Sequence, residues 1–537
     1  MLEVLCTQGL PEGWRFWARA HYLSPFREGE AGFTAKKGRE MTLEKDSKVA
    51  DVRGHRVPTG LFIDGEWLRT GQEIPVINPS DKSEITKVAD GSGGHALEAL
   101  AAADRSAQQW RHWAPRARAD LFHLAHGLLI ERADAFADVM TMESGKPRAE
   151  ALGEFNLSAG FFLWYAEQVA HLHGRYQEGS PGGYRVIETH QPVGPSFLVT
   201  PWNFPMLMSA RKAGAALAAG CTVVIKSARE TPLTAALFID TLQEAGFPAG
   251  VVNLIHTSNS AEVSEQIMAD SRLKKVSFTG SSAVGTVLLK QASNLIINSS
   301  MELGGDGPFI VLDDADVDLA VREAVICKFR NAGQACVAAN RIILHESIAE
   351  EFTEKFLAAT AALKVGDGFD PEVSVGPIIT ERQLNRVSGL VESFQSAGGT
   401  LLAGGNVIDG EGFFFEPTVF RFDSYDHDFC NDELFAPIAA LYTVTTVDEA
   451  LRFANDTHYG LSAYVFSKDL SRVVTVAERL DFGMVGVNRG IMSDPKAPFG
   501  GIKESGLGRE AGHEGIYEFL EPKYIALTID ERSGMEG

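Results

Sequence analysis

Several features that define other classes of protein are scarce or missing in this chain of 537 residues. Its cysteines are few, odd in number and widely spaced, without the CxxC or Cys/His spacings of zinc sites and redox pairs: Cys6, Cys221, Cys327, Cys336 and Cys430. This usage excludes a disulfide scaffold and gives no reason to expect a metal. A reducing cytoplasm is the expected location.

Long apolar runs and basic clusters are also missing. The longest apolar stretches, such as 215–225, are broken by glycine and fall well short of the roughly 20 residues that a membrane-spanning helix needs. The 49 basic and 71 acidic residues give a net charge of −22, and no Lys/Arg block interrupts that balance. Nucleic acid and membrane are therefore disfavoured as partners, which leaves small molecules and further copies of the chain.

The first 40 residues show no lasting periodicity and lack the apolar h-region of a signal peptide. They are either a transit or docking arm or an over-extended start, because Met41 opens an ordinary polar lead-in. We assign residues 1–55 to an N-terminal extension that is either disordered or a mis-assigned start.

The rest of the chain carries a repeated strand and helix pattern. From Leu61 onward, short runs rich in Val, Ile and Phe alternate with longer segments of helical period, which predicts α/β structure with largely parallel sheets. The first series has expected strands at 194–200, 221–227, 251–257 and 274–280, with helices at 205–220 and 231–246. Thr231 is the expected N-cap of the second helix. A second series begins near 308, so two α/β domains are expected.

A β-hairpin arm is expected at 173–192, where an SPGG turn is flanked by alternating residues. Such an arm can pair with the edge of another subunit. A homodimer or homotetramer is therefore expected.

Cys336 is the first candidate for chemistry. In NAGQACVAAN (331–340) it lies in a loop of small residues between an expected helix and an expected strand, where a substrate can approach a thiol closely. Taken alone, this residue is more readily explained as a small buried hydrophobe, because free cysteine is among the most buried residue types. Its interpretation depends on the other motifs.

Two further motifs offer partners for that thiol. In MELGGDGP (301–308), Glu302 ends an apolar strand and is either an ordinary ion-pairing residue or a general base. In TPWNFP (200–205), Asn203 lies between two prolines that fix the backbone around it. Its amide is either an ordinary turn residue or a donor to a developing oxyanion.

Together with FTGSSAVG (278–285), ELFAP (433–437) and PFGGIKESGLGRE (498–510), these motifs resemble, in order, those of the aldehyde dehydrogenase superfamily. The resemblance runs from about Phe62 to about Tyr524. It implies an aldehyde dehydrogenase-like α/β fold: a Rossmann-type cofactor domain, an α/β catalytic domain and a β-hairpin oligomerisation arm. The corresponding ranges are 56–172 and 193–303 for the cofactor domain, 304–508 for the catalytic domain, and 173–192 and 509–537 for the arm and C-terminal segment.

The resemblance also implies catalytic roles. Cys336 adds to the aldehyde, the Asn203 side chain and the Cys336 backbone N–H stabilise the alkoxide, and hydride transfer to the nicotinamide leaves a thioester. Water activated by Glu302 then releases the acid. Lys212 and Glu510 match a proton relay of the family, although a structural ion pair explains both residues equally well.

The resemblance extends to the cofactor. The residues that match cofactor contacts of the family are Thr200, Trp202, Lys226, Gly280, Ser281, Gly285, Glu433 and Phe435. Arg229 stands where the family commonly has a glutamate that repels a 2′-phosphate, and an arginine fork can hold phosphate instead. The expected cofactor is NADP or NAD, with NADP favoured and with Lys226 and Arg229 as its phosphate-side contacts.

Arg211 and Arg330 are the candidates for substrate recognition. Phe204, Leu207 and Arg211 share one face of the helix that follows Asn203, which turns Arg211 toward the pocket that Asn203 lines. Arg330 precedes the nucleophile by six residues. The two arginines either form structural salt bridges or clamp a substrate carboxylate.

The segments SARKAGAALAAG, KFRNAGQAC and GIMSDPKAPFGGIKESGLGRE resemble succinate-semialdehyde dehydrogenases, in which both arginines and a serine matching Ser493 bind the far carboxylate. The resemblance implies oxidation of succinate semialdehyde or a related short ω-carboxy aldehyde. A glutarate or 2-oxoglutarate semialdehyde, an uncharged aromatic or aliphatic aldehyde, and a catalytically silent binding homologue remain alternatives.

Several positions depart from the family pattern. Ala338 replaces a second cysteine able to form a regulatory disulfide, so no redox switch of that kind is expected. Ser227 replaces a proline, Asp306 an asparagine and Ala436 a glycine. The carboxylate of Asp306 either perturbs the base or is solvated.

Overall fold

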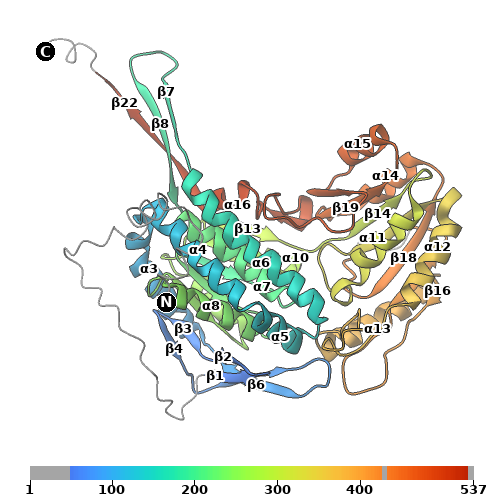
Figure 1. Ribbon diagram of the computed structural model, residues 1–537. Helices are drawn as coiled ribbons and strands as arrows, with labels where there is room; N and C mark the ends of the chain where they lie inside the picture. The colour runs from blue at the N-terminus through green and yellow to red at the C-terminus, as the bar shows by residue number, and fades with distance from the viewer. Residues whose placement is uncertain (1–48, 426–431, 530–537) are drawn as a thin grey trace, which may run out of the picture. The chain divides into compact units, whose positions relative to one another are not determined.

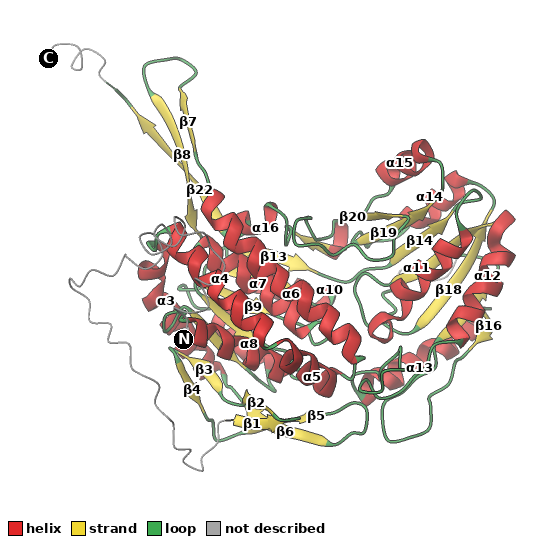
Figure 2. Ribbon diagram, in the orientation of Figure 1, coloured by secondary structure: helices red, strands yellow, loops and turns green. Residues whose placement is uncertain are grey.

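The chain builds two large sheets, each with helices packed against it, and a smaller three-stranded sheet (Figures 1 and 2). The computed structural model describes residues 49–425 and 432–529. Most of the predicted N-terminal extension lies outside this range. Its predicted end is wrong, however, because β1 (Val49–Val52) and β2 (His55–Pro58) already pair as an antiparallel hairpin. Two strands of four residues carry too little periodicity to be recognised in the sequence.

The first large sheet has the strand order β21-β13-β12-β9-β10-β11-β3-β4. Its members are β3 (Leu61–Ile63), β4 (Glu66–Leu68), β9 (Ser196–Val199), β10 (Val223–Lys226), β11 (Val252–Ile255), β12 (Lys275–Thr279), β13 (Asn298–Glu302) and β21 (Gly506–Leu507). Strands β9 to β13 run parallel. The chain builds outward from β9 through β10 to β11 and then returns to β12 on its other side. The carboxyl ends of β9 and β12 therefore border a topological switch point, where sheets of this kind bind ligands.

The second large sheet has the order β16-β17-β18-β15-β14-β19-β20 and is parallel except for β16. Its strands are β14 (Gly307–Val311), β15 (Ala339–His345), β16 (Thr400–Ala403), β17 (Thr418–Phe422), β18 (Ile438–Val444), β19 (Ser462–Phe466) and β20 (Met484–Val487). Its helices are α11 (Val317–Phe329), α12 (Glu346–Ala361), α13 (Glu381–Ser396), α14 (Val447–Asn455) and α15 (Leu470–Arg479). The two predicted α/β series thus form two separate sheets.

The helices around the first sheet include the two that the sequence predicted after Asn203. They are α3 (Gly93–Arg111), α4 (Pro115–Glu131), α5 (Ala133–Ser144), α6 (Arg148–Gln168), α7 (Pro205–Ala219), α8 (Pro232–Ala245), α9 (Ser260–Met268) and α10 (Ser282–Ser293). Both α7 and α8 begin at a proline and end at a glycine with φ of 95°. Because a β-carbon disfavours this left-handed conformation, Gly220 and Gly246 end the helices where the sequence predicted.

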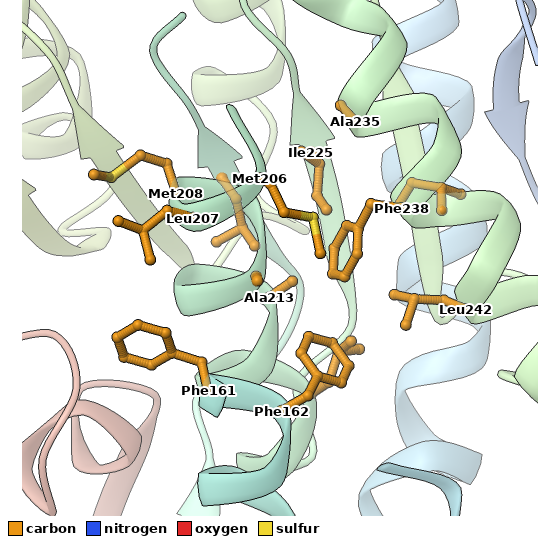
Figure 3. Packing of buried hydrophobic residues seen from close by; sticks show 14 of the residues in the cluster. Phe161, Phe162, Met206, Leu207, Met208, Ala213, Ile225, Ala235, Phe238 and Leu242 are labelled. Atoms are coloured by element: carbon orange, nitrogen blue, oxygen red, sulfur yellow. The ribbon is translucent and has the colours of Figure 1, made fainter. Parts of the chain in front are cut away.

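Every residue of α7 is buried, which its many Ala and Gly residues permit. Figure 3 shows α7 side chains facing aromatic residues of α6 and α8, with Ile225 of β10 behind them. The rings of Phe162 and Phe238 meet edge to face with centroids 5.4 Å apart. The helix that carries Arg211 and Lys212 is thus fixed by packing on several sides.

The start of α8 corrects one prediction. Thr231 occupies the N-cap position, but its side chain makes no capping hydrogen bond. The backbone N–H groups of Leu233 and Thr234 instead donate to the carboxylate of Glu143, at 2.7 and 2.9 Å. A carboxylate from the end of α5 thus supplies the cap from a distant part of the chain, which no local pattern could indicate.

The predicted arm is present as β7 (Arg175–Glu178) and β8 (Arg185–Pro192), which pair antiparallel. A third strand, β22 (Leu520–Leu527), joins the other edge of β8, as Figure 1 shows. A further hairpin joins β5 (Glu73–Ile77) to β6 (Glu84–Ala89). The predicted end of the catalytic domain at 508 needs correction, because β21 belongs to the first sheet and pairs with β13. A strand of two residues at a sheet edge leaves no readable pattern.

Candidate active site

The loop that carries Cys336 links α11 to β15 and has an unusual backbone. Asn331, Ala332 and Gly333 follow one another with φ of 53°, 54° and 69°. A β-carbon on Gly333 would lie 2.1 Å from the carbonyl oxygen of Ala436, so only glycine fits there. The Asn331 side chain fixes the turn by donating to the Asn203 carbonyl at 3.0 Å. The turn delivers Cys336 to the carboxyl edge of the first sheet.

Glu302 lies at the carboxyl end of β13 and is 2% exposed, while Cys336 is 8% exposed. Apart from the neighbouring thiol of Cys336, no described residue is a hydrogen-bond partner of either oxygen of Glu302. Burial raises the pKa of Glu302, and burial together with the charge of Glu302 raises the pKa of Cys336 well above its usual value. Both shifts favour the protonated form of the group concerned, so the resting site holds a neutral thiol beside the carboxyl group of Glu302.

Asn203 follows β9 and is also buried. Its Nδ2 donates to the Gln334 carbonyl at 3.1 Å, which uses one of its two hydrogens. The backbone N–H of Cys336 makes no hydrogen bond to the described residues. One N–H of Asn203 and the N–H of Cys336 thus remain available to an oxyanion formed at the thiol.

Two cavities meet at Cys336. The first has a volume of about 330 Å³ and lies at the switch point of the first sheet. Its lining is Pro201, Trp202, Asn203, Thr279, Gly280, Ser281, Glu302, Leu303, Cys336, Gln383, Arg386, Glu433 and Phe435. Most of the predicted cofactor residues are brought together here, along with Asn203 and Glu302. Gln383 and Arg386, from α13, are additions that the sequence did not indicate.

Four of the predicted cofactor residues lie outside this lining: Thr200, Lys226, Arg229 and Gly285. Thr200 donates its backbone N–H to the Lys226 carbonyl at 3.1 Å, and Gly285 packs against Leu303, where a β-carbon would lie 2.5 Å from the leucine side chain. The Lys226 ammonium is buried, donates to the Ser227 carbonyl at 3.1 Å and has a pKa lowered by burial to about 8. Arg229 is exposed and lines a separate cavity with Arg382.

The first cavity fits a nicotinamide dinucleotide. The helix α10 begins at Ser281 and aims its N-terminal N–H groups at the switch point, which suits a pyrophosphate. The buried ammonium of Lys226 suits a ribose hydroxyl because a charged group at such a site needs further acceptors. Glu433 accepts the N–H of Gly305 at 3.3 Å, and the rings of Trp202 and Phe435 meet edge to face.

The second cavity has a volume of about 360 Å³ and contains the predicted substrate residues. Its lining is Lys146, Glu150, Gly153, Glu154, Leu157, Phe204, Leu207, Met208, Arg211, Arg330, Cys336, Val337, Ile491, Ser493 and Phe499. The predicted face of Phe204, Leu207 and Arg211 does line a pocket beside the nucleophile. The prediction that Asn203 lines the same pocket is wrong, because Asn203 lines the first cavity. The helix begins at Pro205, so Asn203 does not follow the helical spacing.

Arg211, Lys212 and Glu510 form a buried ion cluster. The Arg211 Nε lies 2.6 Å from the Glu510 carboxylate, and Lys212 contacts the other oxygen of that group. Although burial opposes ionisation, Lys212 and Arg211 lower the pKa of Glu510. The Arg211 Nη1 is buried and has no hydrogen-bond partner among the described residues. Part of the guanidinium is thus left for a ligand in the second cavity.

A buried ion pair that the sequence analysis missed joins α6 to the loop before it. Lys146 donates to the Glu154 carboxylate at 2.6 Å and to the Asn203 carbonyl at 2.7 Å. The other oxygen of Glu154 accepts the N–H groups of Met206 and Leu207 at the start of α7. The available signal was the spacing of Glu150 and Glu154 by four residues, which places two carboxyl groups on one face of the helix.

The unusual Asp306 is neither solvated nor free. Its carboxylate lies 2.9 Å from the Nε of Arg341, which is also buried and donates to the Phe453 carbonyl. Burial raises the pKa of Asp306 to about 6. The alternative of a solvated carboxylate is therefore wrong. Ala436 is buried, and its carbonyl faces Gly333 of the nucleophile loop.

No helix in the described part of the chain is long and apolar enough to cross a membrane. Within 49–425 and 432–529, no group of three or more His, Cys, Asp or Glu side chains is arranged to hold a metal ion.

A buried thiol beside a carboxylate, with an oxyanion site and a dinucleotide-type cavity, defines a class of thiol-dependent oxidoreductase. Comparison with known families agrees. The model of the aldehyde dehydrogenase family matches residues 67–525. The chain belongs to the aldehyde dehydrogenase family, so the predicted family and fold are confirmed.

The curated relatives named below align with this chain over nearly their full length. A succinate-semialdehyde dehydrogenase of Paenarthrobacter nicotinovorans is 45% identical over 83% of this chain and 99% of its own. A glutarate-semialdehyde dehydrogenase of Pseudomonas putida is 41% identical, covering 87% and 97%. The NADP(+) succinate-semialdehyde dehydrogenase of Escherichia coli is 40% identical, also covering 87% and 97%.

Solved structures show the same architecture. The crystal structure of an E. coli NADP-dependent enzyme has a TM-score of 0.87 and 40% identity, covering 88% of this chain and 98% of that one. Betaine aldehyde dehydrogenase of Staphylococcus aureus in complex with NAD+ has a TM-score of 0.86 and 32% identity, covering 88% and 96%.

Proposed function

We propose that this enzyme oxidises succinate semialdehyde, or a related short ω-carboxy aldehyde, to the dicarboxylic acid. The observation that carries the proposal is the second cavity, which opens on Cys336 and contains Arg211, Arg330 and Ser493. An aldehyde that meets the thiol with one end can place a carboxylate between the two guanidinium groups at the other. Relatives named as succinate-semialdehyde dehydrogenases support this choice.

The proposed reaction uses the residues around the thiol in order. Glu302 takes the proton of Cys336, and the thiolate sulfur bonds to the aldehyde carbon to form an alkoxide. The free N–H of Asn203 and the backbone N–H of Cys336 stabilise that oxygen. A nicotinamide cofactor held by the residues of the first cavity would supply the acceptor for the hydride lost from the substrate carbon, and Cys336 would then carry the acyl group as a thioester. Water, with its proton taken by Glu302, adds to the thioester carbon, and the acid leaves with the thiol restored.

Lys212, Glu510 and Arg211 have proposed supporting roles. Lys212 and Glu510 form a relay that can carry the proton of Glu302 away from the site, and their buried contact supports this as well as it supports a structural pair. Arg211 shares Glu510 with Lys212, while its unpartnered Nη1 remains for the substrate.

The proposed cofactor is NADP or NAD, with NADP preferred. The proposed contacts are Thr200, Trp202, Lys226, Arg229, Gly280, Ser281, Gly285, Glu433 and Phe435. Arg229 is exposed near the carboxyl end of β10, where it is free to turn toward a 2′-phosphate. The E. coli relative named for NADP(+) supports the preference, and the NAD+ complex of the S. aureus neighbour supports NAD as the alternative.

Glutarate semialdehyde is the second candidate substrate, and a specific finding favours it. The P. putida relative is named for that aldehyde at nearly the same identity as the succinate-semialdehyde relatives. One methylene in a cavity changes binding by only about 1–3 kcal/mol, so the two aldehydes are separated by degree.

We further propose that the enzyme works as a homodimer or homotetramer in a reducing cytoplasm. The exposed strand β7 at the edge of the arm supports association, because its backbone groups are free to pair with another subunit. The need for a free thiol at Cys336 supports the compartment. The mass of the purified enzyme by light scattering measures its association.

A panel of aldehydes with NAD and NADP tests the proposed substrate and cofactor together. We expect the highest kcat/KM for succinate semialdehyde with NADP, followed by glutarate semialdehyde, and far lower values for butanal and benzaldehyde. Arg211→Met should raise the KM for the semialdehydes and leave that for butanal unchanged. Equal kcat/KM for succinate semialdehyde and butanal would contradict the substrate, and a preference for NAD would contradict the cofactor.

A further inference from the structure

Glu150 places a carboxylate inside the cavity that is proposed to bind one. It lies in the first turn of α6 and lines the second cavity with Arg330 and Cys336. The proposed mechanism gives it no role. Among the charged groups of this cavity, it stands out by its position next to the arginine that the substrate carboxylate would meet.

The arginine concerned is free of ion pairs. Arg211 is paired with Glu510 and Lys146 with Glu154, whereas Arg330 forms no ion pair with the described residues. Its guanidinium lies over the ring of Phe204, with 5.3 Å to the centroid. Arg330 and Glu150 thus line the same cavity without forming an ion pair, and the charge of Arg330 lowers the pKa of the Glu150 carboxyl.

The same carboxylate also holds the nucleophile loop. One oxygen of Glu150 accepts the backbone N–H of Asn331 at 2.9 Å. Asn331 is the first of the three residues with positive φ that turn the chain toward Cys336. Left-handed backbone of this kind persists only when surrounding contacts fix it.

We propose that Glu150 is a specificity-determining residue of the second cavity: its charge weakens the binding of a carboxylate at Arg330, and its hydrogen bond keeps the Asn331 turn in place. The inference rests on the proposed function. The dicarboxylic product would bind the same arginine as the substrate, so the opposing charge of Glu150 also promotes product release. Glu150 thus limits the affinity of Arg330 for a carboxylate, and it also stabilises the Asn331 turn that positions Cys336.

The substitution Glu150→Gln separates the two roles, because glutamine keeps an oxygen that accepts the Asn331 N–H and removes the charge. We expect E150Q to lower the KM for succinate semialdehyde by roughly three- to tenfold, the order of effect of removing one like charge that water partly screens. Inhibition by succinate should strengthen in parallel. The KM for butanal, an uncharged aldehyde of the same length, should stay unchanged.

Glu150→Ala is the matched variant that removes both the charge and the hydrogen bond. We expect it to lower kcat for succinate semialdehyde and butanal alike, because the Asn331 turn loses its acceptor. A structural role alone would not produce the selective fall in KM of E150Q. That selective change is therefore the decisive readout, and it remains available if E150A fails to fold.

The pH dependence gives an independent readout. Burial raises the pKa of Glu150 to about 6, against the opposing effects of the Asn331 N–H, Arg330 and Lys146, with Glu154 acting in the same sense as burial. The carboxyl is thus neutral below that pH and charged above it. In the wild type, the KM for succinate semialdehyde should fall as the pH drops through about 6. In E150Q we expect this fall in KM to be absent. Because wild type and variant both retain Glu302 and Cys336, titration of those two groups affects both proteins alike and does not contribute to the difference between them.

Two results would overturn the inference in different ways. A wild-type enzyme without preference for succinate semialdehyde over butanal would overturn the proposed function and this inference with it. A wild type with that preference and an E150Q variant whose KM for the semialdehyde is unchanged or raised would overturn this inference alone.

Discussion

Single residues at the centre of this site are held out of water, and their chemistry follows from that. Burial raises the pKa values of both Glu302 and Cys336, so the resting site favours a thiol over a thiolate. A base that accepts the proton during attack is then necessary, and Glu302 is placed to do so. Glu302 also lines the first cavity together with Cys336, which is where the water of the second half-reaction would have to enter.

Replacement of Glu302 should change both the rate of the reaction and its dependence on pH. Glu302→Gln should lower kcat by about 10²–10⁴-fold, the usual contribution of a general base. Because burial raises the pKa of Glu302, the base form is lost as the pH falls through a value above that of an ordinary carboxyl. The wild-type pH–rate profile should therefore decline on its acid side above the usual carboxyl range. An unchanged kcat with the same acid limb in the variant would show that Glu302 is not the base.

The sequence indicated some of these residues and missed others for a physical reason. Cys336, Glu302 and Asn203 stand in motifs where the local backbone itself serves the chemistry, with glycines or prolines beside them. Lys146 and Glu150 act through contacts with segments that lie far away in the chain, such as the 2.7 Å hydrogen bond from Lys146 to the Asn203 carbonyl. Local patterns carry no record of such contacts.

Elements were predicted best where their ends are marked by residues with special backbone preferences. The helices α7 and α8 begin at proline and end at glycine as expected. Thr231 was correctly predicted at the N-cap position of α8, but the capping hydrogen bonds go to Glu143 of α5, and the two-residue strand β21 was missed because it has no periodicity. The ends of helices and strands that depend on contacts with distant segments therefore cannot be predicted from the local sequence.

The cap of α8 provides the prediction at the scale of elements. Glu143→Ala should leave the buried N–H groups of Leu233 and Thr234 without an acceptor and lower the free energy of unfolding by about 2 kcal/mol. Thr231→Ala is the matched control, since the Thr231 side chain makes no capping hydrogen bond and its loss should cost much less. Thermal denaturation and hydrogen exchange of the first turn of α8 measure both effects. A larger cost for T231A than for E143A would return the cap to Thr231.

The whole molecule brings the site together from segments that are distant in the chain. Glu302 is the last residue of β13 in the first sheet, and the loop that carries Cys336 precedes β15 of the second sheet. The segment after β20 then returns to the first sheet through β21. This return places Glu510 against Lys212, 298 positions earlier in the sequence. A β-carbon on Gly506 would lie 2.1 Å from the Met301 carbonyl, so the return fits only a glycine there. The motifs indicated several of the residues that line the site, whereas the remaining lining residues and the division between two cavities required the fold.

Trapping the acyl-enzyme tests the central claim most directly. Wild type and E302Q are mixed with succinate semialdehyde and NADP, quenched in acid, digested and examined by peptide mass spectrometry. The account predicts a succinyl thioester on the peptide containing Cys336 and none on the other four cysteines, with both slower formation and slower hydrolysis of that thioester in E302Q because Glu302 serves both steps. NADPH formation without acylation of Cys336, or acylation of another cysteine instead, would contradict it.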